Sequence, residues 1–213
     1  MNLHKEAWPE HTYREQDWNP ETYEVAKAAD GATAYCASKI FAEKAAFDYA
    51  KDTNSPFSIA TICPLMVYGP VEHSLTSTAK PNTSSADIYR LMNGSENEVP
   101  QTLFYAFCDV RDVAQARLKA YQREEAANER FFVTGGSYSY QMICDILRKK
   151  FPEIKDRGPE GKPGRGLGVD VYKVDNSKAR KGLEITSRSL EECTMDTARS
   201  LLELERAENA EEA

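Results

Sequence analysis

The sequence has few histidines and no long apolar run. Its three histidines, His4, His11 and His73, are too few and too scattered for a zinc site built on helical or short-loop spacing. No apolar run approaches the ~18 residues that a membrane-spanning helix needs. The first ten residues also lack the basic and then apolar form of a secretory signal. We therefore expect no metal, no membrane partner and a cytoplasmic location.

Paired cysteines and an excess of basic charge are absent as well. The five cysteines are an odd number, widely spaced, with no Cys-x-x-Cys pair, which fits reduced thiols better than a disulfide framework. The formal net charge of −7 argues against nucleic-acid binding, which needs a basic face. With 213 residues, 41% of them hydrophobic, the chain is long enough for one domain or one and a half.

A glycine fingerprint for a dinucleotide is also lacking. After Thr134-Gly135-Gly136 no glycine completes the spacing of such a motif. The glycine-rich stretch 161–168 follows no apolar strand, and Pro163 would obstruct a turn that holds a phosphate, so we expect a loop there. Nothing before Tyr35 has the pattern of a strand, a glycine turn and a helix.

What the chain does have is an alanine-rich run at 34–50 without glycine or proline, which favours a helix. That helix puts Tyr35 and Lys39 four residues apart on one face. A nearby ammonium favours the phenolate form of a tyrosine, so Tyr35 can act as a general acid or base with Lys39 as its partner. Taken alone the pair is a weak signal, because a plain helix with a surface lysine has the same spacing.

The stretches around and after this pair come in a recognisable order. They are Tyr35-Cys36-Ala37-Ser38-Lys39 with Ala42-Glu43-Lys44, then 62–70, then 109–114, with Asn82-Thr83-Ser84 and Gly161-Lys162-Pro163-Gly164 as further matches. The chain resembles the extended short-chain dehydrogenase/reductases, also called the NAD-dependent epimerase/dehydratase family. Within that family it is most similar to the fungal NADPH-dependent methylglyoxal and ketone reductases and, further off, to the dihydroflavonol reductases. The resemblance covers nearly the whole chain.

The resemblance implies an α/β protein that is the C-terminal part of a doubly wound, Rossmann-type parallel sheet plus a small substrate-binding lobe. Residues 1–79 would end the Rossmann part and carry the tyrosine helix, and 80–213 would be mostly substrate lobe with returning sheet elements. Each βαβ unit takes about 30 residues, and family members need several of them before the tyrosine. We therefore expect an incomplete domain without its N-terminal dinucleotide-binding half.

The resemblance also assigns site residues and ligands. Tyr35 and Lys39 would be catalytic and would contact the cofactor, which is NADPH or possibly NADH, while the substrate would be a small carbonyl compound. The backbone around Pro64 and Val67 would meet the nicotinamide, since ligands lie beyond the carboxyl ends of strands in such sheets, although an ordinary loop would have the same sequence. Ser84 would also reach the cofactor; alternatively, Thr83 or Ser84 caps a helix.

One family feature is expected to be absent. Family members hold the substrate carbonyl oxygen with a serine or threonine upstream of the tyrosine, and the first serine here is Ser38. Of the upstream threonines, Thr12, Thr22 and Thr33, none follows an apolar strand. We expect the polarising hydroxyl to be lacking and the isolated chain to be impaired or inactive.

Local patterns complete the prediction. Buried strands are expected at 57–63 and 130–134 and a β-prone aromatic run at 103–108, with helices at 84–92, 141–150 and 189–204. Asp112 and Ser139 are expected to be N-caps. Two other functions remain open: a non-catalytic interaction module, because the lack of an N-terminal half would uncover apolar faces, and an epimerase or dehydratase of the same superfamily.

Overall fold

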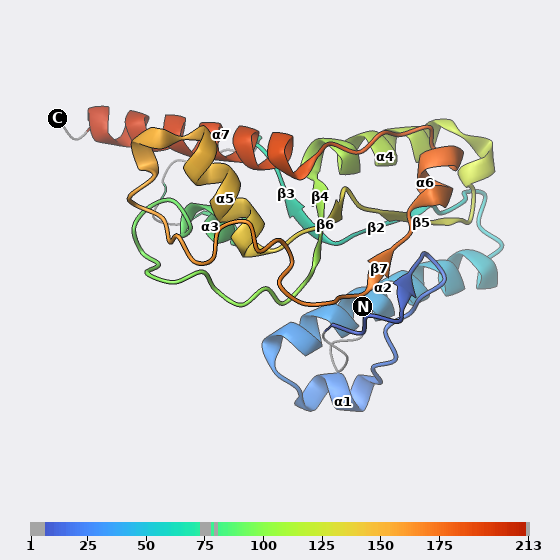
Figure 1. The fold of residues 1–213 in the computed structure, drawn as a ribbon. Helices are drawn as coiled ribbons and strands as arrows, with labels where there is room; N and C mark the ends of the chain where they lie inside the picture. Colours follow the sequence, from blue (N-terminus) through green and yellow to red (C-terminus); the bar gives the residue numbers. More distant parts are fainter. Residues whose placement is uncertain (1–6, 73–77, 79–80, 212–213) are drawn as a thin grey trace. The chain divides into compact units, whose positions relative to one another are not determined.

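A computed structural model describes residues 7–72, 78 and 81–211. The chain divides into two compact units. Their helices and strands are labelled in Figure 1. The first comprises Met1–Cys63, Ala114–Val133 and Val171–Ile185; the second comprises Pro64–Val113, Thr134–Asp170 and Thr186–Ala213. Each unit is therefore built from three separate segments of sequence. The expected division near residue 79 stays a prediction, because compactness does not show which part contacts a substrate.

The first unit contains two pairs of strands that are far apart in sequence. Its longest helix is α2. Its elements are β1 (Thr12–Tyr13), α1 (Tyr23–Ala28), α2 (Gly31–Asp52), β2 (Thr61–Pro64, up to Cys63), the greater part of α4 (Val110–Gln122), η1 (Glu124–Ala126), β5 (Arg130–Val133), β7 (Lys173–Val174) and α6 (Ser177–Gly182). Strand β1 pairs with β7 in parallel, and β2 pairs with β5.

Helix α2 forms where the alanine-rich run predicts it. It begins earlier than the run itself, because the carboxylate of Asp30 accepts the backbone N–H of Thr33 at 2.9 Å and caps the helix. Its inward face is a short row of buried side chains, Thr33, Ala37 and Ile40. The opposite face is exposed to solvent.

The second unit is built on a three-stranded sheet of order β3-β4-β6. Its elements are β3 (Met66–Tyr68), α3 (Thr83–Tyr89), β4 (Ala106–Asp109), the first turn of α4, β6 (Gly136–Ser137), α5 (Tyr140–Lys150), η2 (Pro152–Ile154) and α7 (Leu190–Glu211). Strands β3 and β4 run parallel, and β4 and β6 antiparallel. The predicted α/β class with parallel pairing is confirmed.

Helices α3, α5 and α7 supply the core of the second unit, and α7 contacts both of the others. The core includes Ile88, Leu91, Ile143, Leu147 and Leu201, each at most 2% exposed. Burying a side chain of this size stabilises a fold by about 1.5–3 kcal/mol. The unit therefore has its own hydrophobic core. None of the helices among the described residues has the length and apolar character that crossing a membrane requires.

Several local predictions are confirmed and several are wrong. Ser139 caps α5, accepting the N–H of Met142, and Pro64 ends β2 as expected. The strand expected from residue 57 begins only at Thr61. The cap of α3 is Asn82, whose side-chain amide oxygen accepts the N–H of Ser85, so neither Thr83 nor Ser84 has that role.

The helix expected to begin at Val113, after an Asp112 cap, begins three residues earlier, at Val110. Asp109 lies before it and accepts the backbone N–H of Arg111 at 2.8 Å. Asp112 is fully buried and pairs instead with Arg188 from the segment before α7. Asp112 is thus a buried ion-pair residue and not an N-cap. Helix α7 also continues to Glu211, beyond the end expected at 204.

Candidate active site

Tyr35 and Lys39 lie together on the exposed face of α2. The Lys39 ammonium nitrogen is 5.0 Å from the centre of the Tyr35 ring, and 62% of Tyr35 is exposed. The helix places the two side chains side by side, because residues four positions apart are neighbours on a helix surface. The Ser38 hydroxyl is not part of this arrangement, because it donates to the Tyr35 carbonyl at 2.7 Å.

The arrangement places a phenol hydroxyl, a group that can serve as a general acid or base, on the same helix face as an ammonium group. No carboxylate among the described residues forms an ion pair with Lys39, so its charge is available to the phenol or to a bound ligand. Both side chains reach solvent from the same turn of the helix, where a substrate and a cofactor can approach.

One helical turn beyond Lys39, Glu43 ties α2 to the strands. Its carboxylate accepts the Thr61 hydroxyl of β2 at 2.6 Å and two guanidinium N–H groups of Arg130 from β5, at 2.8 and 3.1 Å. Burial alone would raise the pKa of Glu43, but the hydrogen bonds from Arg130 and Thr61 outweigh it and lower that pKa below its ordinary value of 4.5. Glu43 is therefore held as a paired carboxylate.

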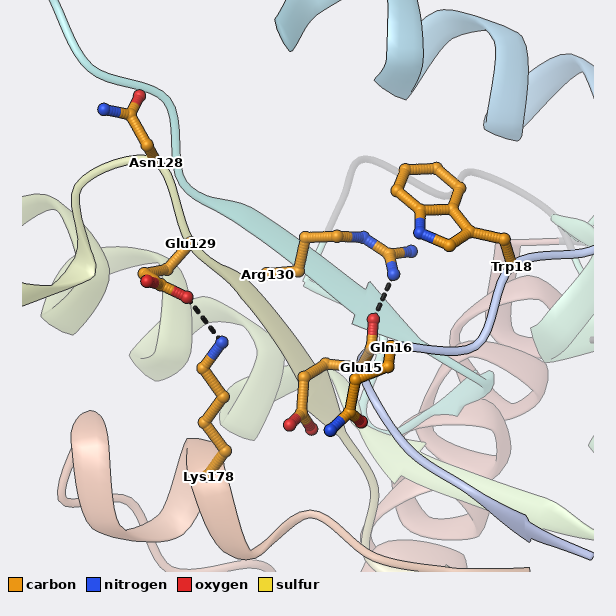
Figure 2. A pocket seen from close by; sticks show the side chains of 7 residues that line it. All are labelled: Glu15, Gln16, Trp18, Asn128, Glu129, Arg130 and Lys178. Atoms are coloured by element: carbon orange, nitrogen blue, oxygen red, sulfur yellow. Dashed lines mark hydrogen bonds and ion pairs between the residues drawn. The ribbon is translucent and has the colours of Figure 1, made fainter.

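Arg130 is the residue on which several segments converge (Figure 2). Besides the bidentate pair with Glu43, it donates to the backbone carbonyl of Glu15. Its guanidinium carbon lies 3.7 Å from the centre of the Trp18 ring. Residues 15–18, α2 and β5 are thus joined through one side chain. The sequence carries no local signal for this cluster, since Glu43 and Arg130 are 87 positions apart.

A hollow of about 300 Å³ opens beside Arg130. Its lining, drawn in Figure 2, is Glu15, Gln16, Trp18, Asn128, Glu129, Arg130 and Lys178. The two cations of the lining are already paired, Arg130 with Glu43 and Lys178 with Glu129, the latter at 2.6 Å. Neither Tyr35 nor Lys39 lines this hollow, which is therefore distinct from the tyrosine site.

The other predicted site residues belong to the second unit. Pro64 is the last residue of β2, Val67 lies in β3 opposite Cys108 of β4, and Ser84 is half-buried in the first turn of α3. The Asn82 side-chain amide donates to the Ser84 hydroxyl at 3.2 Å. Strand β3 and helix α3 are in contact, so the structure brings the elements of Val67 and Ser84 together. In the first unit, the side chains of Tyr35 and Lys39 are brought together on α2.

A hydrogen-bonded group of tyrosines links β3 to α3. The hydroxyls of Tyr68 and Tyr140 both donate to one oxygen of Asp87 at 2.6 Å, and Arg90 donates to the other oxygen at 2.8 and 3.1 Å. Burial, followed by the hydrogen bond to Asp87, raises the pKa of Tyr140 to about 12. The Tyr140 hydroxyl therefore keeps its proton at neutral pH and donates it to Asp87. No sequence signal predicted the group, whose members come from three elements.

The upstream threonines have structural roles. Thr22 caps α1, where its hydroxyl accepts the N–H of Val25 at 3.4 Å. Thr33 is buried on the inner face of α2, and Thr12 lies in β1 opposite Lys173. The sequence predicts that none of these three threonines holds the carbonyl oxygen of a substrate. Among the described residues, no group of three or more histidine, cysteine, aspartate and glutamate side chains could hold a metal ion.

Comparison with known proteins gives the chain its relatives. No family model matches it. An oxidoreductase of Schizosaccharomyces pombe is 41% identical over 194 residues, which are 90% of this chain and 56% of the relative. The NADPH-dependent methylglyoxal reductase Gre2 of Saccharomyces cerevisiae is 37% identical over 199 residues, 91% of this chain and 58% of Gre2. The homologues of this chain are fungal NADPH-dependent methylglyoxal reductases and ketoreductases of the short-chain dehydrogenase/reductase family.

The structural comparison agrees with these homologues. The crystal structure of the yeast methylglyoxal/isovaleraldehyde reductase Gre2 complexed with NADPH matches at a TM-score of 0.89 and 34% identity, over 96% of this chain and 61% of that one. The Rossmann-type fold expected from the resemblance is thereby confirmed, and so is the expected similarity to the fungal reductases. The chain spans less than two thirds of the length of these reductases.

Proposed function

We propose that this chain takes part in the NADPH-dependent reduction of an aldehyde or ketone to an alcohol. The observation that carries the proposal is the exposed pair of Tyr35 and Lys39 on one face of α2. The Lys39 ammonium nitrogen lies 5.0 Å from the centre of the Tyr35 ring. Support comes from the homologues, among which Gre2 is named an NADPH-dependent methylglyoxal reductase.

In this reaction NADPH supplies the hydride that the carbonyl carbon accepts. Tyr35 donates its hydroxyl proton to the carbonyl oxygen, so that the two transfers together convert C=O to CH–OH. Lys39 stabilises the phenolate that remains, and its ammonium holds the cofactor ribose through hydrogen bonds. The segment around Pro64 and Val67, with Ser84, would contact the nicotinamide end.

We propose NADPH before NADH because two of the relatives are named NADPH-dependent methylglyoxal reductases and Gre2 was solved in complex with NADPH. The substrate class is a small carbonyl compound, for which methylglyoxal is the first compound to test. The reductase reading is preferred to an epimerase or dehydratase, because the relatives with high identity carry reductase names.

The deciding experiment is a chimera. The 199 residues of yeast Gre2 that match this chain are replaced by the corresponding residues of this chain, and NADPH oxidation is followed with methylglyoxal. We expect turnover that Tyr35→Phe abolishes. A folded chimera that binds NADPH but shows no turnover contradicts the proposal.

The 213-residue chain alone is expected to show little or no turnover. Positioning both reactants supplies much of the rate of such a reaction, and the sequence contains no glycine fingerprint for the pyrophosphate. NADPH oxidation by the purified chain that Tyr35→Phe removes would overturn this expectation.

A second candidate function, a non-catalytic interaction module, is favoured by one observation. Several large apolar side chains of the first unit are about half exposed or more, namely Tyr23, Val25, Tyr35, Tyr49 and Phe57. Exposed apolar patches mark partner surfaces or cause aggregation. Size-exclusion chromatography distinguishes a partner-binding surface from one that only causes aggregation. A monodisperse chain without bound nucleotide supports the interaction module, and heavy aggregation contradicts it.

We also propose a reducing compartment, the cytoplasm, as the place of action. All five cysteines are free thiols, and Cys108, Cys144 and Cys193 are buried. Such thiols persist where glutathione and thioredoxin keep proteins reduced. Fluorescence microscopy of a tagged chain tests this assignment.

A further inference from the structure

We propose that Arg130 is a positioning residue for the Tyr35 and Lys39 pair, acting through its bidentate ion pair with Glu43. The role in catalysis rests on the proposed function, whereas the control of the orientation of α2 does not. Glu43, Arg130 and the Trp18 ring together are called the clamp below.

The clamp lies just after the buried part of the inner face of α2. The buried residues on this face are Thr33, Ala37 and Ile40, all in the first half of the helix. The next position of the same stripe is Glu43, three residues after Ile40. At this point a carboxylate takes the place of an apolar side chain, so the helix is held to its strands by polar contacts.

The geometry of Arg130 allows little freedom. Two of its N–H groups meet the two oxygens of Glu43 at 2.8 and 3.1 Å, and a third group donates to the Glu15 carbonyl. The Trp18 ring covers the guanidinium plane at 3.7 Å (Figure 2). A planar fork bound on both edges and one face defines the direction of its partner as well as the distance. A lysine at this position would keep the charge but lose the fork.

The distance along the helix turns this restraint into a positioning effect. Glu43 lies eight positions after Tyr35, which is about 12 Å at about 1.5 Å per residue. A tilt of about 5° about Glu43 therefore moves Tyr35 by about 1 Å. A misplacement of about 1 Å at a reacting group can lower the rate about 100-fold. Small changes at the clamp should therefore be felt at the tyrosine.

Residual dipolar couplings of backbone amides in the full 213-residue chain test the orientation directly. We expect Arg130→Lys to change the couplings of α2 relative to those of β2 and β5, while the couplings within α2 still fit one straight helix. Glu43→Gln, which keeps the shape and the Thr61 contact, should cause a smaller change of the same kind. If either variant fails to fold, the other decides.

Glu129→Gln is the matched control. It breaks the neighbouring ion pair with Lys178 of α6. Both residues of this pair line the same hollow, whose lining includes no side chain of α2. We expect no change in the α2 couplings. Unchanged couplings in folded Arg130→Lys and Glu43→Gln, accompanied only by a lower melting temperature, would overturn the proposal, since a purely stabilising pair would behave in that way.

The chimera with Gre2 provides the catalytic readout. Arg130→Lys should lower kcat about 100-fold with KM within about twofold, because the acid is misplaced while binding is kept. An equal loss in Glu129→Gln would contradict the positioning role. If the unmodified chimera has no turnover, the proposed function fails, and the dipolar couplings still decide whether the clamp sets the orientation of α2.

Discussion

At the scale of single residues, the candidate site depends on which polar groups are exposed and which are paired. Tyr35 reaches solvent, whereas Glu43, on the same helix, is paired on both oxygens. The first arrangement leaves a hydroxyl free to react, and the second fixes a charge. Two predictions at this scale separate reactivity from stability.

The first concerns the tyrosine itself. Tyr35→Phe in the chimera should lower kcat at least about 100-fold, since general acid catalysis contributes about 10²–10⁴-fold. The melting temperature should not change, because 62% of the side chain is exposed. Tyr49→Phe is the control, as Tyr49 lies on the same face of α2 and is 61% exposed. A similar loss of activity in both variants would argue against a special role for Tyr35.

The second concerns the pH dependence of the Glu43 contact. The pKa of Glu43 is lowered in the folded protein, so its contribution to stability is complete above the ordinary value of 4.5 and is lost as the pH falls through the folded value. Urea unfolding should therefore show wild type more stable than Glu43→Gln at pH 6, with the difference shrinking below pH about 4.5. A difference that grows on acidification would reverse the assigned sign.

At the scale of elements, local signals predicted the helices well and their polar partners poorly. The alanine-rich run predicted α2, and Ser139 predicted the start of α5. The sequence predicts Asp112 as a cap, because a buried ion-pair aspartate and an N-cap look the same in sequence. Its partner, Arg188, is 76 positions away. The tyrosine group around Asp87 and the Glu43 contact with Arg130 escaped prediction for the same reason.

The cap of α3 gives a prediction at this scale. Asn82→Ala should destabilise the second unit by about 1 kcal/mol, because the N–H of Ser85 loses its acceptor. Ser84→Ala should have almost no effect on stability, since Ser84 only accepts a side-chain hydrogen bond from Asn82. Urea unfolding of both variants provides the measurement. A larger loss for Ser84→Ala would restore the alternative in which Ser84 is the cap.

At the scale of the whole molecule, the thiols report on folding. Burial raises the pKa of the Cys144 thiol to about 12 and raises those of Cys108 and Cys193 further. We expect these three to react with a thiol reagent only after unfolding, and Cys36 and Cys63, which are partly exposed, to react in the native protein. All five should react in denaturant without added reductant. Fewer than five would reveal a disulfide.

The interleaved segments of the two units have a consequence for synthesis on the ribosome. The first unit is complete only after residue 185, and the second only when α7 has been made. The first unit is therefore completed only shortly before the second, and neither can finish folding until most of the other has been translated. A premature stop before residue 171 would deprive both of their closing segments, so we expect such products to be degraded together and not to leave one stable half behind.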